Sequence, residues 1–544
     1  MTDSTSSLYL FQRCIFINYN KIPNFVTVQN SHMKNLLYTT ITLASITAFG
    51  QNISNQTIDQ VTENAIKTFN VPGISVAVIK DGAIVHSKGY GVKSIKTGEK
   101  VNSSTNFGIA SNSKAFTAAA LAILVDEGKI KWDDKVIAII PEFKMYNDYV
   151  TKEFTIRDLL THRSGLGLGA GDLMVWPDGH NFTPKDIIQN IHFLQPVSGF
   201  RAKYDYDNLL YIIAGEVVER VSKQTWLNFI TERLLEPIGM NHTAASWNVL
   251  VDRKDVIDPH VPIDGKLQVI ERYKNPIFDA AAGLYSNVDD LAKWLQFQLN
   301  KGKVNGKQLI SEKQMQEMIT PQTLQSIRTA APYNSLFKAY GLGWQLQDMN
   351  GKLEVSHTGG LEGIVTQTMF YPQLNLGIVI LTNQQEGLAF RAISNTIKDF
   401  YLGNKSQDWV ANYDKILKQN VAEADVITDE VWKTVEANKK NKAIKFDIKN
   451  LVGTYKDNWF GDVEIYEKKG KLIFESKRSP QLTGEMSFYK DNTYAVKWNN
   501  RYFHADAFVF AEMNDGKLVG FKMKPISPLT DFSYDFQDLN FTRK

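Results

Sequence analysis

Residues 111–128 read SNSKAFTAAALAILVDEG and hold the most informative pattern in the chain. From Ala115 onward the residues are helix-forming and mostly apolar, and Gly128 is typical of a helix end. Residues three apart share a helix face, so the Lys114 amine is expected to reach the Ser111 hydroxyl. A buried lysine with a lowered pKa can remove the proton that keeps a serine hydroxyl unreactive. The helix N-terminus adds free N–H groups where an oxyanion would form.

The Ser-x-x-Lys spacing is not specific by itself, because it occurs at four places in the chain. The other copies begin at Ser31, Ser335 and Ser487 and end at Lys34, Lys338 and Lys490. None of these three copies opens a long apolar helix. We therefore expect the Ser111 copy to supply the nucleophile.

Two further short motifs follow in the chain, Tyr206-Asp207-Asn208 and His357-Thr358-Gly359-Gly360. With Ser-x-x-Lys they resemble the signature of the serine β-lactamase and penicillin-binding-protein superfamily. The chain looks most like the branch that contains class C β-lactamases, D-aminopeptidases and esterases. The similarity covers about residues 60–390 and is clearest over residues 72–92, 106–140, 154–168, 199–243 and 281–299.

The resemblance implies an α+β fold, in which a β-lactamase-like antiparallel sheet is flanked by helices and joined by a helical lobe. The turn residues Asp81-Gly82 predict an opening hairpin of strands at 74–80 and 83–89. The expected site is the cleft between the sheet and the lobe, with Ser111 at its floor. Further strands are expected near 341–347, 352–357, 364–371 and 376–382, and helices at 111–127, 156–160, 208–222 and 225–235.

The resemblance also implies a catalytic role for each motif residue. Ser111 attacks a carbonyl group, and the backbone N–H groups of Ser111 and Gly360 hold the oxyanion. Tyr206 protonates the leaving group and then helps to activate the deacylating water, while Asn208 orients Lys114 and the substrate. The base of acylation is either Lys114 or Tyr206, and the sequence leaves that choice open.

His357 stands where most members of the superfamily have lysine. Together with Thr358 and Gly359 it lies on the strand expected to form one wall of the site, where glycine lets a ligand approach the backbone closely. An imidazole is mostly neutral at pH 7, which weakens the case for binding a substrate carboxylate. We therefore expect weak β-lactamase activity in comparison with ester or amide cleavage.

Two of the motifs have competing copies. Lys96-Thr97-Gly98 precedes Ser111 and lies in a charged stretch typical of a hairpin loop. Tyr-x-Asn also occurs at Tyr273 and Tyr285. We choose Tyr206 because it stands where a loop enters a helix with apolar residues at a period of 3.6. The alternative is a structural role, with Tyr206 in the core and Asn208 as a helix cap.

Composition limits the possible functions of the chain. Its 544 residues are 43% apolar and 22% charged with a net charge of +3, as in soluble globular proteins of two or more domains. No basic block indicates a nucleic-acid partner. No zinc motif or phosphate-binding glycine loop is evident, so we expect no metal or cofactor. The expected partner is a small molecule or short peptide, and the oligomeric state is left open.

The first 50 residues are expected to be a leader, and residues 1–32 resemble no part of the superfamily. They contain Cys14, the only cysteine of the chain. Residues 33–50 combine Met33-Lys34, an apolar stretch and small residues before Gln51, which is the layout of a secretory signal peptide. We expect translation to begin at Met33 and the mature protein to be secreted or periplasmic, without an integral membrane span. An uncleaved membrane anchor is the alternative.

The C-terminal part differs in character from the predicted hydrolase domain at residues 51–403. Residues 404–445 are charged and helix-forming and read as a connector, whereas residues 446–544 alternate between apolar and polar with turn signals. About eight short strands there resemble the lipocalin-like barrel appended to some D-aminopeptidase-like hydrolases. We expect this barrel to fold independently and to limit access to the cleft. Its expected core aromatics are Trp459, Phe460, Tyr466, Phe474 and Trp498.

The interpretation favoured by these observations is an exported serine hydrolase that forms an acyl-enzyme on small peptides or amides, of the D-aminopeptidase or D,D-carboxypeptidase type. One alternative is an esterase or β-lactamase with the same machinery. Another is a penicillin-binding sensor whose acyl-enzyme persists. Specificity is expected to lie in loops such as 168–182 and 320–336, from which the substrate cannot be read.

Overall fold

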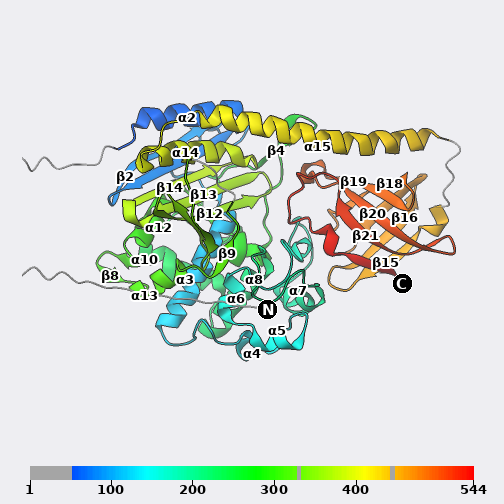
Figure 1. Cartoon of the computed structure of the whole chain (residues 1–544), viewed down its shortest axis with the longest axis horizontal. Coiled ribbons are helices and arrows are strands. Elements are labelled where there is room, and N and C mark those ends of the chain that lie inside the picture. The colour runs from blue at the N-terminus through cyan, green and yellow to red at the C-terminus, as the bar shows by residue number, and fades with distance from the viewer. Residues whose placement is uncertain (1–51, 328–331, 442–447) are drawn as a thin grey trace, which may run out of the picture. The chain divides into compact units, whose positions relative to one another are not determined.

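The computed structural model describes residues 52–327, 332–441 and 448–544, and the predicted leader lies outside the described residues. The larger part is an eight-stranded antiparallel sheet with helices on both faces, as predicted (Figure 1). The strand order across the sheet is β2-β1-β14-β13-β12-β11-β10-β9. The strand bounds are Gly73–Lys80 (β1), Ala83–Gly91 (β2), Thr323–Gln325 (β9), Lys338–Tyr340 (β10), Gln345–Met349 (β11), Lys352–Leu361 (β12), Ile364–Tyr371 (β13) and Leu376–Thr382 (β14).

The neighbouring strands β1 and β14 are buried on both faces, which explains their nearly continuous apolar sequences. Successive side chains of a strand point to opposite faces, so Val76 and Val78 of β1 pack with one helical layer and Ala77 and Ile79 with the other. The first layer contains α2 (Asn55–Thr68) and α14 (Gly387–Leu402), and the second contains α3 (Ser113–Asp126) and α12 (Val288–Leu299). The sheet is therefore sandwiched between two apolar helical faces.

The predicted opening hairpin is present, but the strand predicted at 341–347 begins only at Gln345. At the hairpin, Asp81 and Gly82 both have positive φ, as a two-residue turn between twisted strands requires. Gly343 has φ +79°, and a Cβ atom there would lie 2.9 Å from the Cα atom of Ala115. This close approach to α3 explains why the backbone bends before β11 starts.

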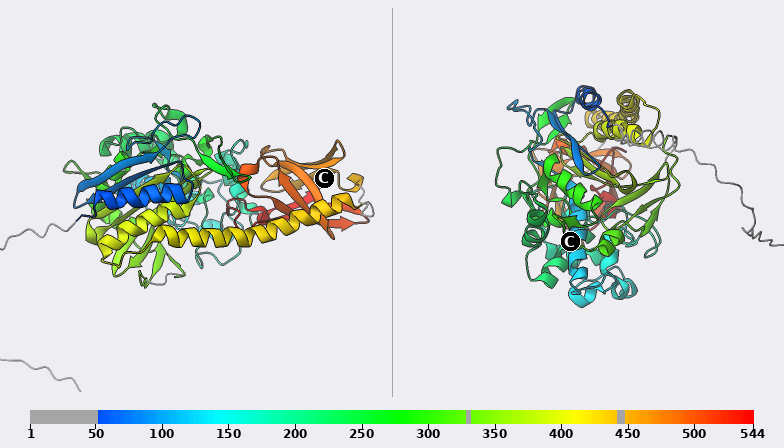
Figure 2. Two further views of the ribbon diagram at one scale, coloured as in Figure 1. Left: turned by 90° about the horizontal axis from the view of Figure 1, so that it is seen from above. Right: turned by 90° about the vertical axis from the view of Figure 1, so that its left-hand side faces the viewer.

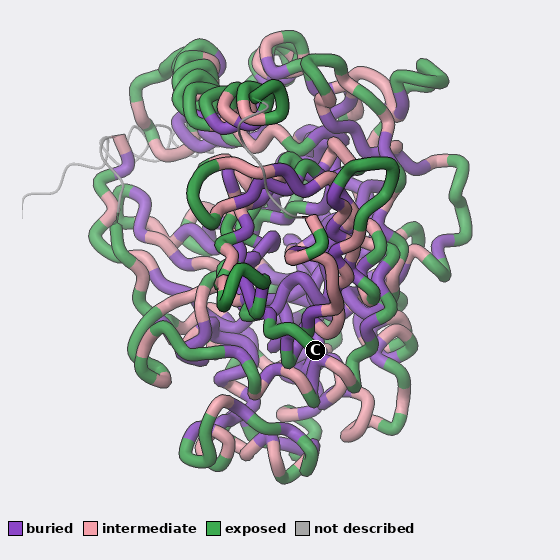
Figure 3. The backbone as a smooth tube through the Cα atoms, turned by 90° about the vertical axis from the view of Figure 1, so that its right-hand side faces the viewer, coloured by how far each residue is buried: buried purple, intermediate pink, exposed green. Residues whose placement is uncertain are grey.

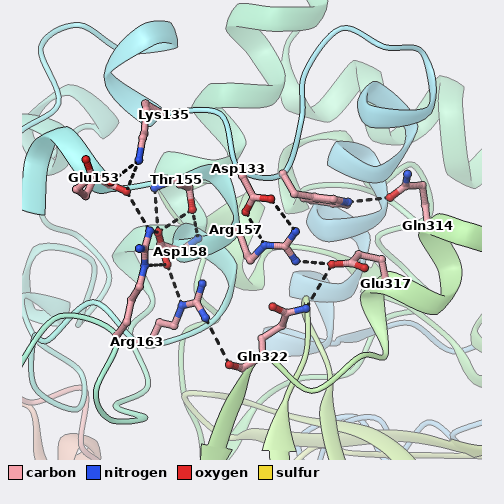
Figure 4. Close-up of polar contacts among 12 residues, drawn as sticks. Asp133, Lys135, Glu153, Thr155, Arg157, Asp158, Arg163, Gln314, Glu317 and Gln322 are labelled. Atoms are coloured by element: carbon pink, nitrogen blue, oxygen red, sulfur yellow. Dashed lines mark hydrogen bonds and ion pairs between the residues drawn. The ribbon is translucent and has the colours of Figure 1, made fainter.

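A helical lobe packs beside the sheet and carries the loops that reach the site. It contains α4 (Val136–Ile139), α5 (Asp148–Glu153), α6 (Ile156–Leu160), α7 (Pro184–Asn190), α8 (Leu209–Ser222) and α9 (Trp226–Ile230), which continues as a π-helix over Thr231–Leu235. Figure 4 shows Asp158 at the centre of a polar network in this lobe. Its fully buried carboxylate accepts hydrogen bonds from Arg163 at 2.8 Å and from Arg201 at 2.6 Å. These contacts anchor the two segments that enter the site, near residues 162 and 206.

The predicted connector contains one long helix, α15 (Trp409–Lys440), which Figure 2 shows extending from the sheet layers to the C-terminal barrel. Val410 belongs to the core beneath α14, and Val431 and Val435 pack against barrel residues Ala495 and Ile526. The helix is thus packed at both ends. Across the described ranges, no helix has both the length and the apolar character needed to cross a membrane.

The C-terminal strands close into an eight-stranded antiparallel barrel, as the lipocalin-like resemblance implies. The bounds are Gly453–Asp457 (β15), Gly461–Lys468 (β16), Lys471–Ser476 (β17), Thr483–Lys490 (β18), Thr493–Trp498 (β19), Ala507–Asn514 (β20), Lys517–Pro525 (β21) and Asn540–Arg543 (β22). In Figure 3, which faces this side of the molecule, buried segments gather toward the middle, and exposed segments follow the rim and also cross the middle near the C-terminus.

Four of the five aromatic residues predicted for the barrel core are buried there, namely Trp459, Phe460, Phe474 and Trp498. Tyr466 is the exception, and the prediction that it lies in the barrel core is wrong. In β16 the inward positions are Val463 and Ile465, so the period of two turns Tyr466 outward. Its hydroxyl donates to Glu475 on the neighbouring strand β17.

Candidate active site

Ser111 and Lys114 lie at the start of α3, where the sequence places them. Ser111 belongs to a short 3₁₀ turn, Ala110–Asn112, and the Lys114 Nζ atom lies 3.1 Å from the Ser111 Oγ atom. Nζ also lies 2.7 Å from Asn208 Oδ1 and 3.1 Å from the carbonyl oxygen of Ala281. A neutral amine has two hydrogens and one lone pair. Because the other two neighbours can only accept, the lone pair of the neutral amine faces Ser111.

The turn that presents Ser111 is held from the adjacent strand β13. The Asn112 side chain donates to the Ile109 carbonyl at 3.0 Å and to Thr366 Oγ1 at 2.9 Å, and it accepts from Thr368 Oγ1 at 2.7 Å. Ala110 has φ +51°, a left-handed conformation that is strained for a residue with a Cβ atom. The fixed turn leaves the Ser111 N–H in the first helical turn, where N–H groups lack intrahelical acceptors.

Lys114 is fully buried, and its surroundings favour the neutral amine. Burial lowers its pKa to about 7, although the carboxyl groups of Asp172 and Asp207 act in the opposite direction. The rings of Tyr206 and Tyr211 lie 4.9 Å and 5.3 Å from Nζ. A substantial fraction of this lysine is therefore unprotonated near neutral pH, as a general base needs.

Tyr206 faces the nucleophile from the helical lobe, and its side chain interacts with that of Ser111. Burial raises its pKa well above its ordinary value, while the interaction with Ser111 partly opposes this. Tyr206 is therefore a phenol, able to donate a proton, in the free protein. Its ring packs on His162 at 4.3 Å between centroids and edge-on to Phe532 of the barrel part at 5.7 Å.

His357 lies in the strand β12 and is buried and neutral. Its Nδ1 atom donates to the carbonyl oxygen of Thr358 at 2.5 Å, so Nε2 accepts from the Tyr340 hydroxyl at 2.9 Å. Burial, together with the charge of Lys114, lowers its pKa to about 3. The imidazole therefore offers no positive charge to a substrate carboxylate at neutral pH.

The two glycines of the third motif have different surroundings. A Cβ atom at Gly359 would lie 2.3 Å from the carbonyl oxygen of Ile109, because β12 passes closely over the turn before Ser111. A Cβ atom at Gly360 would meet no heavy atom within 4 Å. The pairing of β11 with β12 ends at Ser356, so the edge of β12 that carries Thr358 and Gly360 borders the cavity.

These residues surround one cavity of about 550 Å³. Ser111, Tyr206, Asn208, His357, Thr358 and Gly360 all line it, so every predicted site residue except buried Lys114 and Gly359 reaches its wall. Leu168 and Trp176 from one predicted specificity loop and Gln325 from the other also line it. The barrel part contributes Tyr502, Phe503, His504, Leu529 and residues 531–534.

The competing motif copies lie elsewhere. Lys96, Thr97 and Gly98 form an exposed turn. Tyr285 is buried in a two-stranded sheet, where its hydroxyl donates to the carbonyl oxygen of Tyr273. Neither copy lines the cavity with Ser111.

Comparison with known proteins identifies the family. The family model described as Beta-lactamase matches residues 58–400, which is more than half of the chain. The chain belongs to the beta-lactamase family. A second model, a domain of unknown function (DUF3471), matches residues 438–543.

Individual relatives agree with this assignment. Protein flp of Staphylococcus aureus (strain MRSA252) is 28% identical over 335 residues, or 61% of this chain and 63% of its own length. Unguisins hydrolase ungD' of Aspergillus campestris is 28% identical over 348 residues, 60% of this chain and 61% of its own. The matched region thus spans less than two thirds of these relatives. The octameric penicillin-binding protein homologue from Pyrococcus abyssi shares the fold, with a TM-score of 0.58 and 20% identity over 90% of this chain and all of that one.

Membership in the beta-lactamase family makes this chain one of a family of serine hydrolases.

The structure also shows site residues that the sequence did not reveal. Asp172 is fully buried, and its Oδ2 atom accepts from Asn208 Nδ2 at 2.7 Å and from the Ser533 hydroxyl at 2.8 Å. This contact fixes the Asn208 amide so that Oδ1 faces Lys114. Burial raises the pKa of Asp172, and the negative charge of Asp207 adds to that effect.

A second barrel residue, Asp535, holds the lobe segment that carries Asp172. Its carboxyl group accepts from the backbone N–H groups of Gly171 at 2.6 Å and Leu173 at 3.0 Å. The sequence predicts no site residue in the barrel. Ser533 lies in a loop where no motif or periodic pattern indicates a role in the site. Among the described residues, no group of three or more His, Cys, Asp or Glu side chains could hold a metal ion.

Proposed function

We propose that this chain is an exported serine hydrolase that forms an acyl-enzyme at Ser111 on small peptide, amide or ester substrates, of the D-aminopeptidase or D,D-carboxypeptidase type. The observation that carries the proposal is the 3.1 Å contact between Ser111 Oγ and a buried Lys114 whose pKa lies near 7. A nucleophile with a base in reach, oriented in turn by a third group, is the arrangement that covalent catalysis requires.

In the acylation step, neutral Lys114 takes the proton of the Ser111 hydroxyl as Oγ attacks the substrate carbonyl carbon. The backbone N–H groups of Ser111 and Gly360 stabilise the negative charge that develops on the carbonyl oxygen. Tyr206 then gives its proton to the departing amine or alkoxide, and the bond to that group breaks. In the second step water attacks the resulting ester, and the Tyr206 phenolate takes a proton from that water. Lys114 returns its proton to Oγ as the bond between Oγ and the acyl carbon breaks, which releases the acid and regenerates Ser111.

The choice of base follows from the pKa directions of the two candidates. The pKa of Lys114 is lowered to about 7, whereas that of Tyr206 is raised well above its usual value. At neutral pH the lysine therefore has a free lone pair and the tyrosine has a proton to donate. We assign Lys114 as the base of acylation and Tyr206 as the proton donor to the leaving group.

β-Lactam hydrolysis is the less favoured alternative, because neutral His357 offers no cationic partner for the carboxylate of a β-lactam. The name of one relative, unguisins hydrolase, indicates that a protein similar to this chain hydrolyses a substrate other than a β-lactam. A persistent acyl-enzyme, as in a penicillin-binding sensor, is distinguished by turnover. Steady release of product from an ester supports the hydrolase, and a single burst supports the sensor.

The central experiment treats the protein with a fluorophosphonate probe and maps the adduct by mass spectrometry. Labelling is expected at Ser111 and at no other serine. The Ser111→Ala variant is expected to lose both labelling and hydrolysis of p-nitrophenyl acetate. Full activity in that variant, or an adduct at Ser335 or Ser487, would disprove the assignment.

Export forms a separate part of the proposal and rests on residues 33–50 alone. Expression in a bacterial host should give a mature chain whose N-terminus lies near Gln51. Mass spectrometry of the periplasmic fraction measures this directly. A chain that retains these residues in the cytoplasmic fraction contradicts export.

A further inference from the structure

One part of the cavity wall carries two carboxyl groups, Glu362 and Asp531, from different parts of the chain. Glu362 occupies the two-residue turn between β12 and β13, since Leu361 pairs with Ile364. Asp531 belongs to the barrel segment between β21 and β22. The two acids interact electrostatically with each other.

Glu362 is buried without a partner. Its exposed fraction is only 7%, its Oε1 atom has no hydrogen-bond partner, and none of the described ion pairs includes it. Burying a carboxyl group without compensation is unfavourable, so native proteins nearly always pair such groups. Burial and the like charges of Asp178 and Asp531 raise its pKa to about 8. A cationic ligand in the cavity would supply the missing partner.

The neighbouring acids do not supply it. Asp178 accepts from the backbone N–H groups of Gly179 and Lys274, and Asp531 Oδ1 accepts from the N–H of Ser533. The cavity's lysine, Lys338, lies on β10, which is separated from β12 by β11. His504 is an imidazole whose pKa is lowered, first by burial. The part of the wall near Glu362 is therefore acidic.

Aromatic rings complete this part of the wall. Trp176, Tyr502 and Tyr534 line the same cavity, and the two tyrosines interact electrostatically with Glu362. Aromatic faces attract organic cations, and carboxylates form strong charge-assisted hydrogen bonds with ammonium groups. Rings and acids together suit a primary alkylammonium group better than they suit an anion or a bare metal ion.

We infer that Glu362, Asp531 and the rings of Trp176, Tyr502 and Tyr534 form a subsite for a primary ammonium group of the substrate. The inference rests on the proposed acyl transfer at Ser111 and names the substrate class of that site. Glu362 follows Gly360 by two residues, in the turn that ends β12, and both residues line the cavity that holds Ser111. An amine bound at Glu362 therefore occupies the same cavity as the carbonyl group that Ser111 attacks. Preferred substrates are therefore amides or esters of amino acids and peptides with a free amine.

The first test compares matched substrates that differ only in this charge. Alanine p-nitroanilide, in both enantiomers, is compared with its N-acetyl counterpart. For the preferred enantiomer, wild-type kcat/KM is expected to be at least about tenfold higher with the free amine than with the N-acetyl compound. A ratio of this size corresponds to the free energy of one charge-assisted hydrogen bond. Glu362→Gln and Asp531→Asn should each reduce that ratio. Glu512→Gln, which removes a charge from an exposed barrel position, is the matched control and should leave the ratio unchanged.

A second measurement uses wild-type protein only, so it remains decisive even when Glu362→Gln does not fold. n-Butylammonium should inhibit p-nitrophenyl acetate hydrolysis competitively and at least about tenfold more strongly than 1-butanol. Equal inhibition by the two probes, or equal kcat/KM for free and acetylated substrates in a protein that is labelled at Ser111, overturns the ammonium subsite alone. Absence of labelling at Ser111 overturns the proposed function instead.

Discussion

Lys114 has two hydrogen-bond acceptors, Asn208 Oδ1 and the carbonyl of Ala281, and one neighbour to activate, the Ser111 hydroxyl. Only the neutral amine can accept the serine proton, and its pKa is about 7. The reactive form is therefore lost as pH falls through 7 and is complete above about pH 8. We expect kcat/KM for p-nitrophenyl acetate to rise with pH through an apparent pKa near 7. Lys114→Ala should lower kcat by a factor of at least ~10².

A substitution at Asp207 tests whether Lys114 controls this pH profile. Burial raises the pKa of Asp207 itself to about 7, and its ionised carboxylate raises the pKa of Lys114. Its Oδ1 atom accepts from the N–H of Leu209 at the start of α8. Asp207→Asn keeps an oxygen for that N–H but removes the charge. The midpoint of the kcat/KM profile should therefore move to lower pH. A midpoint that stays in place, or moves upward, indicates that another group controls the rate.

Tyr206 and Tyr285 are two copies of one motif, and only the first faces Ser111. Tyr206→Phe removes the proton donor to the leaving group and should lower kcat for an anilide by about 10². Tyr285→Phe should change kcat little, because it removes only a hydrogen bond to a backbone carbonyl, worth about 1 kcal/mol of stability. Steady-state kinetics of both variants show which of the two tyrosines acts in the reaction. An active Tyr206→Phe beside an inactive Tyr285→Phe would reverse the assignment.

At the scale of elements, the sequence predicted what depends on local pattern. The opening hairpin and the helix after Ser111 follow from periodicity and turn residues near each other in the chain. Tyr466 was misplaced because the alternation along β16 was not applied to it. Asp172, Ser533 and Glu362 are polar residues of a short 3₁₀ helix, a loop and a turn, and their importance arises from contacts between segments far apart in sequence. No local pattern encodes such contacts.

The two glycines of β12 allow a prediction about how this strand supports the site. A Cβ atom at Gly359 would lie 2.3 Å from the Ile109 carbonyl and 2.6 Å from Thr366 Oγ1. Gly359→Ala should therefore push β12 away from the Ser111 turn, destabilise the fold by about 1–3 kcal/mol and slow fluorophosphonate labelling. At Gly360 the space is open, so Gly360→Ala should leave the melting temperature unchanged. Thermal unfolding of both variants measures the difference. Equal melting temperatures would show that the close approach of Gly359 to the Ile109 carbonyl does not affect stability.

At the scale of the whole molecule, the barrel does more than cover the cavity. Three hydrogen bonds connect it to Lys114. The Ser533 hydroxyl and the Asn208 amide both donate to Asp172 Oδ2, and Lys114 Nζ contacts Asn208 Oδ1. Asp535 adds acceptors for the N–H groups of Gly171 and Leu173. The barrel therefore helps to hold the loop that orients Asn208 and, through it, Lys114. We therefore expect the proposed chemistry to depend on a part of the chain that contains none of the three motifs.

Ser533→Ala in the full chain tests that dependence. The variant removes one of the two donors to Asp172 Oδ2, and the Ser533 hydrogen bond is among the contacts that lower the pKa of Asp172. Without it, Asp172 should be ionised less, and the Lys114 pKa, which that charge raises, should fall. We expect kcat to fall several-fold and the kcat/KM midpoint to move to lower pH. Thr483→Ala is the matched control, because the Thr483 hydroxyl donates to the carbonyl oxygen of Pro480 in an exposed barrel turn that does not line the cavity, and the variant should change neither quantity. If Ser533→Ala lowers the melting temperature but leaves the pH midpoint at the wild-type value, the barrel stabilises the loop without influencing the base.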